Sequence, residues 1–506
     1  MNKKIKRLFS DTIILAFGTF ASKLLVFLLL PLYTDYLSPE MYSTADLISQ
    51  AANLIIPFAC LGVTDAVFRF VTDKQNDGDA VLSSGMLIML CGFVLFLALA
   101  PVLMLFDKFD GYVWLILLYV LAADVHSLFA QYIRASGKTA LFAWQGIINT
   151  GLTVGFNVLF LVKFGMGIIG YVLSVIIADA AVSVILFFGA GLFRHISPGK
   201  INGALIFQML KYCLPLIPTV IFWWVTNVSD RYIVAEICGD SINGLYSAAY
   251  KIPTLITLAS AVFNEAWQFF AFSGDEPVDE KTAGTDDLPG KSVASAATED
   301  TKVKASKRKN AYYYGKTFAA FSTVMILVCS FLIMISGWLC GKLFAESYIG
   351  VEKYVPTLLL ATVFTSLVTF LSSIYALAKK TVMSFVTAAA GAIINIVLNL
   401  IFIPKFGAEG AAIATFICYF VVFVVRSFNT KQYLEFRIYS PIFVISVVII
   451  IVQCILAWFV PGIIGQIITF AVLLIVNLPV ILDTCIAVFP GISKILKKNK
   501  PESSKN

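Results

Sequence analysis

Residues 138–165 read KTALFAWQGIINTGLTVGFNVLFLVKFG, and residues 380–407 read KTVMSFVTAAAGAIINIVLNLIFIPKFG. Both segments begin with Lys-Thr, carry an asparagine at the same later position (Asn157 and Asn399), and end with Lys-Phe-Gly. A constant offset between apolar segments indicates two copies of one helical unit. Transporters are often built from two such repeats with a substrate site between them. The pattern therefore favours a duplicated membrane transporter over a soluble enzyme.

A second, shorter repeat supports the first one. Tyr42-Ser43 recurs as Tyr246-Ser247, at an offset about 38 residues smaller than that of the long repeat. A polar stretch of about this length, residues 273–311, lies between the second copies of the two patterns. The chain therefore reads as one ancestral unit present twice, with a hydrophilic insertion in the second copy.

The composition predicts an all-α polytopic membrane protein. Of the 506 residues, 59% are hydrophobic and 13% charged, and the mean hydropathy is +0.89. Soluble domains have about 25% charged residues. About 14 apolar segments reach the roughly 20 residues that a membrane helix needs. They span residues 11–32, 44–68, 81–106, 112–133, 140–162, 167–193, 213–237, 245–272, 315–341, 354–378, 382–403, 408–425, 438–460 and 463–489.

These spans predict four parts of the chain. Residues 1–212 form an N-terminal lobe of six helices, and residues 213–437 form a second six-helix lobe. An even number of helices in each repeat gives both lobes the same orientation in the membrane, with a cavity between them. Residues 438–493 are an appended helix pair, and residues 494–506 are a basic tail. Within the second lobe, the acidic and then basic segment 273–311 is expected to be a disordered cytoplasmic linker.

The distribution of positive charge predicts the orientation. Most of the 37 lysines and arginines fall on one face of the predicted topology, which is then the cytoplasmic face, with both termini inside. The protein is thus expected in the cytoplasmic membrane. The net charge of +7 fits a basic rim beside anionic lipid and implies no nucleic-acid partner. The nine cysteines lack paired spacing and read as small core residues rather than disulfides or metal ligands.

Ionisable residues inside the spans gather in the first two helices of each repeat, and spans nine to twelve have none in their interiors. An ionised side chain in the middle of a membrane helix costs on the order of 2.5–3.5 kcal/mol, so such residues mark functional sites. The cleft between the lobes is then expected to be polar. These residues are Lys23, Asp46, Asp65 and Arg69 in the first repeat, and Asp230, Arg231, Glu236, Lys251 and Glu265 in the second.

Two of these residues are candidate substrate-binding cations. Lys23 lies roughly 14 Å below the outer end of its span, at 1.5 Å per residue. It either faces the cavity and binds an anion, or pairs with an acid on a neighbouring helix. Arg231 likewise either faces the cavity or pairs across helices. The planar fork of an arginine suits a phosphate group well.

The remaining charged residues are gate or coupling candidates. Asp46 and Lys251 lie near the outer ends of their spans at nearly matching repeat positions. They form either an ion pair that closes an outer gate or a solvated interfacial pair. Asp65, Arg69 and Glu265 are candidates for an inner gate, and Asp230 for a gate or coupling group.

One histidine lies inside the predicted spans. His126 falls in the fourth span together with Asp124, and Asp179 falls in the sixth. An imidazole in this position either relays protons or is a satisfied packing residue. The sequence leaves both interpretations open.

Several motifs resemble the polysaccharide biosynthesis (O-antigen flippase-like) transporters of the multidrug/oligosaccharidyl-lipid/polysaccharide superfamily. They are Leu-Pro-Leu-Tyr at 30–33, YSAAYKIP at 246–253 with FNEAW at 263–267, NIVLN at 395–399, IPKFG at 403–407 and GAAIAT at 410–415. The resemblance covers nearly the whole chain apart from residues 273–311. Because the motifs are largely helix-packing patterns, they identify the fold better than the cargo.

The resemblance implies a flippase that moves polyprenyl-pyrophosphate-linked oligosaccharides between leaflets by alternating access through a cationic cavity. It implies no enzymatic chemistry and no cofactor, with a proton or sodium gradient as the energy source. A polysaccharide polymerase or glycosyltransferases are candidate partners, besides membrane lipid.

Three alternatives stay open. The chain also resembles a lipid II flippase in its architecture. A cation-coupled multidrug antiporter of the same superfamily is the second alternative. The antiporter would need acids deep in the cavity, where Lys23 would repel a cationic drug. A membrane scaffold without transport activity fits the duplicated lobes less well.

Overall fold

The computed structural model describes residue 24 and residues 27–73, 75–103, 111–273, 299–378, 380–434, 436–459 and 462–488. These residues form helices and connections with no strand, which confirms the predicted all-α class. Eleven helices are long and apolar enough to cross a membrane, or twelve if the bent pair α3–α4 is one span. The predicted count of about 14 is therefore approximate. Of the two other predicted spans, 11–32 lies largely outside the described residues, and 245–272 is split between α11 and α12.

The helices are α2 (Leu30–Tyr36), α3 (Pro39–Ala59), α4 (Val63–Thr72), α5 (Gly78–Leu103), α6 (Val113–Ala135), α7 (Thr139–Asn157), α8 (Gly167–Gly189), α9 (Gly203–Cys213), α10 (Ile217–Cys238), α11 (Asp240–Ala249), α12 (Thr254–Ser273), α13 (Glu299–Leu343), α14 (Val355–Leu377), α15 (Thr381–Phe406), α16 (Ala408–Asn429), α17 (Pro441–Phe459) and α18 (Ile463–Val488).

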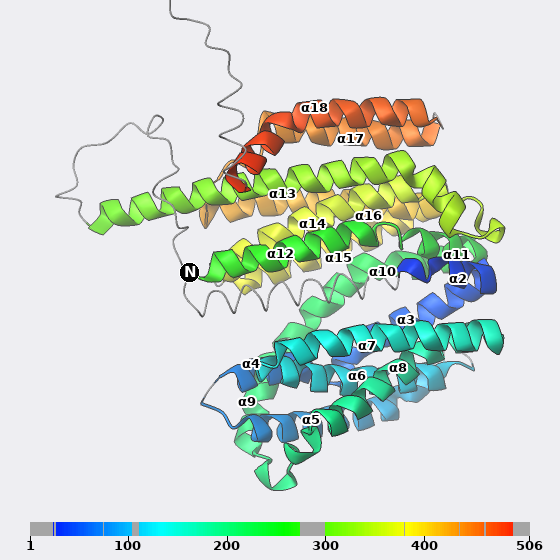
Figure 1. Ribbon diagram of the computed structural model, residues 1–506, viewed down its shortest axis with the longest axis vertical. Coiled ribbons are helices and arrows are strands. Elements are labelled where there is room, and N and C mark those ends of the chain that lie inside the picture. Colours follow the sequence, from blue (N-terminus) through cyan, green and yellow to red (C-terminus); the bar gives the residue numbers. More distant parts are fainter. Residues whose placement is uncertain are drawn as a thin grey trace, which may run out of the picture.

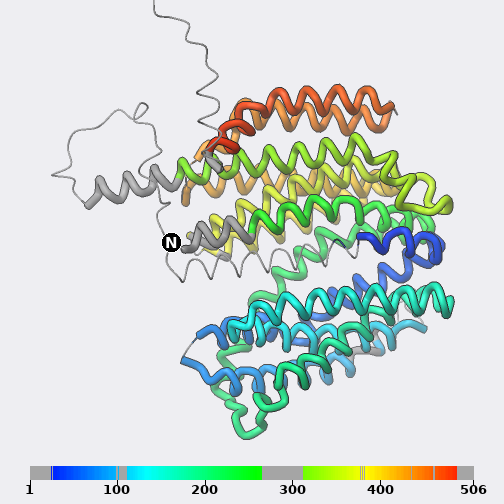
Figure 2. The backbone as a smooth tube through the Cα atoms, in the orientation of Figure 1, coloured from blue at the N-terminus to red at the C-terminus, as the bar shows by residue number. Residues whose placement is uncertain are grey.

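The helices form two bundles, with α10 running from one toward the other (Figure 1). The first bundle contains α4 to α9, and its apolar interior includes Val67, Leu128 and Met209. The second contains α12 to α16, and its core is rich in phenylalanine, such as Phe318 and Phe423. The helices α17 and α18 pack on α13 at the far side of the second bundle (Figure 2). The division into lobes at residue 212 stays a prediction, as does the boundary at 437.

The long sequence repeat has matching local structure in both copies. Helices α7 and α15 each begin directly after a lysine, Lys138 or Lys380, whose backbone ψ angles are 55° and 54°. Asn157 and Asn399 are both fully buried. The glycine that ends each motif has a positive φ, 59° at residue 165 and 63° at residue 407. Glycine adopts this left-handed conformation without the strain of a Cβ atom.

The short repeat marks the place where the two bundles meet. Its two copies lie in α3 and α11, which pack against each other at the right-hand end of the molecule in Figure 1. Tyr42, Ser43, Tyr246 and Ser247 are all fully buried there. The backbones approach so closely that a Cβ atom on Gly244 would lie 1.9 Å from the Pro39 carbonyl oxygen. The two copies of one motif therefore build the contact between the halves.

The prediction of a disordered linker over 273–311 is wrong in its last third. Helix α13 begins at Glu299, so residues 299–311 are helical, and residues 274–298 lie outside the described residues. The segment 301–310 is made mainly of lysine, alanine, serine and arginine. Alanine, lysine and arginine have high helix propensity, which lets the apolar helix of the following span extend into this polar segment.

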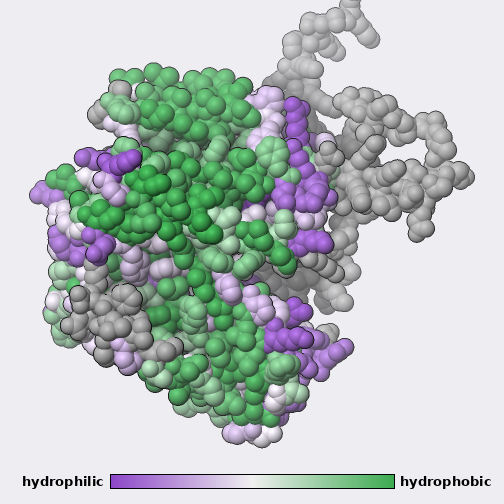
Figure 3. Space-filling model, turned by 180° about the vertical axis from the view of Figure 1, so that it is seen from behind, coloured by the Kyte–Doolittle hydropathy of each residue, from purple (hydrophilic) through white to green (hydrophobic). Residues whose placement is uncertain are grey.

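The molecular surface has the character expected of a membrane protein. Figure 3 shows a broad apolar area over the sides of both bundles, with hydrophilic residues gathered toward the ends of the helices. The helix α18 illustrates this pattern, because Ile464, Ile467 and Ile475 project outward and are exposed. Such an apolar face suits contact with lipid chains. The multi-pass membrane character predicted from the composition is thereby supported.

Candidate functional site

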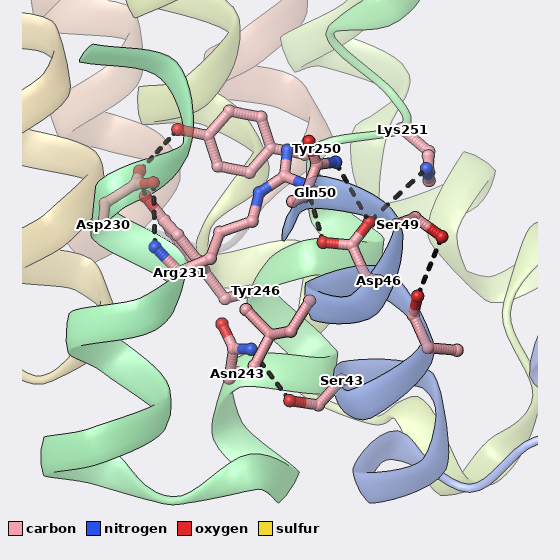
Figure 4. Close-up of polar contacts among 12 residues, drawn as sticks. Ser43, Asp46, Ser49, Gln50, Asp230, Arg231, Asn243, Tyr246, Tyr250 and Lys251 are labelled. Atoms are coloured by element: carbon pink, nitrogen blue, oxygen red, sulfur yellow. Dashed lines mark hydrogen bonds and ion pairs between the residues drawn. The ribbon is translucent and has the colours of Figure 1, made fainter. Parts of the chain in front are cut away.

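A buried ion pair joins the two bundles. The Arg231 guanidinium on α10 donates a hydrogen bond from Nη1 to Asp46 Oδ2 on α3, over 2.7 Å. Figure 4 shows the Arg231 and Asp46 side chains pointing toward each other. Asp46 is only 1% exposed and Arg231 8%. Burying an ion pair is favourable only when its geometry is good and its charges are matched. This contact meets both conditions and links residues that are 185 positions apart in the sequence.

Asp46 has two further partners. Lys251 Nζ lies 4.0 Å from Asp46 Oδ1, and the Gln50 amide donates to the same oxygen over 3.5 Å. Lys251 follows α11 in a short turn before Pro253. The structure thus brings together Asp46 and Lys251, the two residues predicted as an outer pair, and adds Arg231 to them. Their action as a gate is a proposal.

The second carboxylate of the site, Asp230, is held by hydroxyl groups. Tyr246 and Tyr250 each donate a hydrogen bond to Asp230 Oδ2 over 2.7 Å. Thr415 on α16 donates to the same oxygen over 3.3 Å, and the Arg231 backbone N–H donates to Oδ1 over 2.9 Å. The Tyr250 ring also lies 4.4 Å from the Arg231 guanidinium carbon, in cation–π geometry. Tyr250 therefore connects Asp230 to the Arg231–Asp46 pair.

A cavity of about 170 Å³ lies beside this network in the second bundle. Arg231 and Tyr250 border it, and Arg231 Nε is buried without a hydrogen-bond partner among the described residues. Amide and hydroxyl groups provide most of the other polar lining. These residues are Asn227, Thr254, Thr257, Thr362, Thr365, Thr415 and Tyr419. The cavity can therefore offer one cation and many neutral hydrogen-bonding groups to a ligand.

The other predicted site residues are not brought together. Lys23, the first candidate cation, lies outside the described residues, and the side chain of Glu265 is likewise not described. Asp65 and Arg69 are both exposed on α4. Arg69 stacks over the Tyr212 ring at 4.5 Å, and in the described part of the chain no ion pair joins it to Asp65. The predicted inner gate therefore stays a prediction.

The sequence reasoning missed the hydroxyl partners of Asp230. Tyr246 and Tyr250 are four residues apart, a spacing that places side chains on the same side of a helical turn. This spacing could have indicated from the sequence that the two tyrosines act together. Thr415 comes from a helix 185 residues away from Asp230, and nothing in the local sequence indicates that contact.

A buried arginine in the second bundle was not singled out from the sequence, because residue 426 lies just beyond the predicted span 408–425. Arg426 lies on α16 and is fully buried. It donates to the hydroxyls of Thr387 and Ser372 and to two backbone carbonyls. The residue is close to the end of its apolar run, so hydropathy could not distinguish a loop position from a buried one.

No group of three or more histidine, cysteine or acidic residues in the described ranges is arranged to hold a metal ion. The interlobe contact, which consists of Asp46, Asp230, Arg231 and Lys251 with their partners, instead has paired charges and hydroxyl groups. Such an arrangement can bind a ligand or hold two bundles together without covalent chemistry.

Comparisons with known proteins agree with this architecture. Residues 8–268 match a family described as polysaccharide biosynthesis protein. A structure of the lipid II flippase MurJ in an inward closed conformation is similar, with a TM-score of 0.66 and 16% identity, covering 94% of this chain and 99% of that one. No curated protein sequence matches.

Two further solved structures have the same fold. The inward-facing conformation of a multidrug resistance MATE family transporter gives a TM-score of 0.62 at 14% identity, over 81% of this chain and 95% of that one. A multidrug/oligosaccharidyl-lipid/polysaccharide superfamily transporter from Pyrococcus furiosus, described as having reversed binding-pocket polarity, gives 0.55 at 12% identity, over 84% and 96%.

Proposed function

The chain belongs to the polysaccharide biosynthesis protein family of the multidrug/oligosaccharidyl-lipid/polysaccharide superfamily, and we propose that it is a flippase. Its cargo would be a polyprenyl-pyrophosphate-linked oligosaccharide, carried across the cytoplasmic membrane for the synthesis of cell-surface polysaccharide. The observation that carries the proposal is the Asp46–Arg231 contact beside a cavity lined by hydroxyl groups. It supplies a cation for an anionic group next to hydrogen-bonding partners for sugar.

The arrangement of the bundles supports alternating access. They meet at one end of the molecule, where α3 contacts α11 (Figure 1). The α4–α5 connection and the N-terminal end of α13 lie at the opposite end, and both belong to the basic face predicted to be cytoplasmic. In that orientation the contact is the closed outer side of the transporter. Transport then requires the contact of Asp46 with Arg231 and Lys251 to break and reform.

The chemistry of the site suits a pyrophosphate better than a cationic drug. Asp46 is neutralised by Arg231 and Lys251, and Asp230 is held by hydroxyl groups. Neither acid is therefore free to attract a cation in this state. Arg231 borders the cavity, and it becomes available to an anionic group when its contact with Asp46 breaks. Lys23 remains the second proposed cation. A multidrug antiporter is accordingly the less favoured function.

The proposal is tested by translocation of a fluorescent lipid-linked oligosaccharide in proteoliposomes. Wild-type protein is expected to expose the oligosaccharide on the other leaflet, and Lys23→Ala to reduce the rate by about tenfold or more, since one well-placed charged contact contributes about 1.5–3 kcal/mol. The exposed Lys353 provides a control, because Lys353→Ala should transport normally.

The substrate class is decided by running the same assay with other cargo. Transport of lipid II in place of the lipid-linked oligosaccharide would favour a function in peptidoglycan synthesis. Efflux of a cationic dye, with no transport of either lipid, would contradict the flippase proposal. Full activity of Lys23→Ala would show that Lys23 is not part of the substrate site.

A further inference from the structure

The first bundle contains a titratable cluster that the interlobe contact does not use. His126 on α6 lies between two helices, with Nδ1 2.9 Å from Asp179 Oδ1 on α8 and Nε2 2.6 Å from Gln145 Oε1 on α7. The Asn149 amide on α7 donates to Asp179 Oδ1 over 2.6 Å. The helices α7 and α8 thus place three polar side chains around the imidazole on α6, inside the membrane region.

The imidazole has a suitable partner in both of its protonation states. A protonated ring donates from both nitrogens, and it faces a carboxylate oxygen and an amide oxygen, which both accept. A neutral ring can keep the Nδ1–H bond to Asp179 while Nε2 accepts from the Gln145 amide, after that amide rotates by half a turn. The cluster can therefore gain or lose a proton without moving the backbone.

The cluster is not completely enclosed by protein. The side chains of His126 and Asp179 are 17% and 13% exposed, unlike the nearly sealed Asp46. Histidine is also the side chain whose unperturbed protonation changes between about pH 5 and 8.

The surrounding ionisable groups place the cluster near the interlobe contact. The Tyr119 side chain on α6 is close enough to both Asp179 and Asp46 to interact electrostatically with each. Asp124, two residues before His126, is buried beside Cys60 at the break between α3 and α4. The helix α7 carries no titratable residue. Other titratable groups on helices packed against α6 are Glu40 and Tyr42 on α3, Asp65 and Arg69 on α4, Asp79 and Cys91 on α5, and Tyr171 on α8.

We propose that His126 and Asp179, held by Gln145 and Asn149, form a proton-binding site whose occupancy controls the transport cycle. The existence of the site stands on the geometry alone, and its control of transport rests on the proposed flippase function. Protonation would place a positive charge on α6 beside Asp179, and loss of the proton would leave an uncompensated carboxylate in the bundle. The helix α6 packs against α3, which carries Asp46, so this change of charge arises beside a helix of the interlobe contact.

The site is tested directly by nuclear magnetic resonance of the full chain labelled with ¹⁵N-histidine. The chain has two histidines, so the His195→Gln variant leaves His126 as the single labelled signal. The signal should change between the neutral and protonated forms with a midpoint between about pH 5 and 8. In a background that also carries Asp179→Asn, the midpoint should fall by about one pH unit or more, because the facing charge is gone.

Two results would overturn the site: a His126 signal that does not change over this pH range, or a midpoint that Asp179→Asn leaves in place. If Asp179→Asn does not fold, Asn149→Ala serves instead. It removes a donor to Asp179 and keeps the charge, so the midpoint should rise or stay while the titration persists. Loss of the titration in Asn149→Ala would contradict the proposal.

The role in transport is tested by translocation at several pH values. Wild-type transport should change several-fold between about pH 6 and 8, and His126→Gln should be nearly independent of pH in the same range. An unchanged pH profile in His126→Gln would show that the site does not control transport. Absence of translocation in the wild type with every cargo would instead reject the flippase function, and the resonance titration would still decide the proton site.

Discussion

Replacing Gly244 by alanine is expected to stop translocation while the protein stays folded and inserted in the membrane. The new Cβ atom would lie 1.9 Å from the Pro39 carbonyl oxygen, 2.5 Å from its carbonyl carbon and 2.8 Å from its Cα atom. These are backbone atoms, which cannot rotate away as a flexible side chain would. Helices α3 and α11 would have to separate, so the state in which the bundles meet becomes inaccessible. Because each bundle keeps its own core, folding should be spared.

The measurement combines translocation in proteoliposomes with a distance between spin labels at Glu40 and Ser241, two exposed positions on α3 and α11. The label distance should increase in Gly244→Ala and the rate should fall below a tenth of the wild-type value. Gly341→Ala is the matched control, because nothing lies within 4 Å of the added Cβ atom. Wild-type transport with an unchanged label distance would mean that this contact does not form during the cycle.

Arg231→Ala is expected to have the second largest effect, a loss of transport of at least about tenfold. Removal of the guanidinium leaves the Asp46 carboxylate buried, with Lys251 4.0 Å away as its remaining cation. Removing one partner of a buried ion pair costs about 3–5 kcal/mol. This cost falls on the state in which α3 and α10 are in contact. The conformational equilibrium should therefore move away from that state.

A double-mutant cycle tests whether the loss of transport comes from breaking the Asp46–Arg231 pair. Asp46→Asn and Arg231→Gln should each impair transport, and the double variant should lose less than the sum of the two in free energy, since neither Asp46 nor Arg231 is left facing an uncharged partner. Arg134→Ala is the control, because Arg134 is an exposed arginine that stacks on Phe68 and Phe142 in the first bundle. Strictly additive losses would show that Asp46 and Arg231 act independently.

Much of the fold could be predicted from the sequence because the repeats carry local information. The motif at 138–165 specifies a helix start, a buried asparagine and a left-handed glycine, and its copy at 380–407 reproduces all three. Hydropathy identifies most of the spans for the same reason, since apolar length is a property of neighbouring residues. The short repeat lies in the two helices that form the interface, but the sequence did not predict that they touch.

The site could be predicted only in part. Charge in a membrane span singles out Asp46, Arg231 and Lys251, but the side chain that pairs with each depends on how the two bundles are oriented. Helix packing between distant segments has no local signature, so the contacts of Thr415 with Asp230 stayed hidden. The prediction of a disordered linker over 273–311 was incorrect for another reason. Its composition indicates disorder, whereas the helix that follows imposes its own geometry on residues 299–311.

The four charged residues of the interlobe contact have a consequence for the response to membrane voltage. With Asp46, Asp230, Arg231 and Lys251 all ionised, two negative and two positive charges lie within one contact, and their sum is zero. Moving one elementary charge through the membrane potential involves about 2.3 kcal/mol per 100 mV. A motion that carries the four charges together therefore transfers almost none of that energy. A motion that separates α3, with one negative charge, from the segment with Asp230, Arg231 and Lys251, with one net positive charge, responds to voltage according to how far these charges move along the membrane normal.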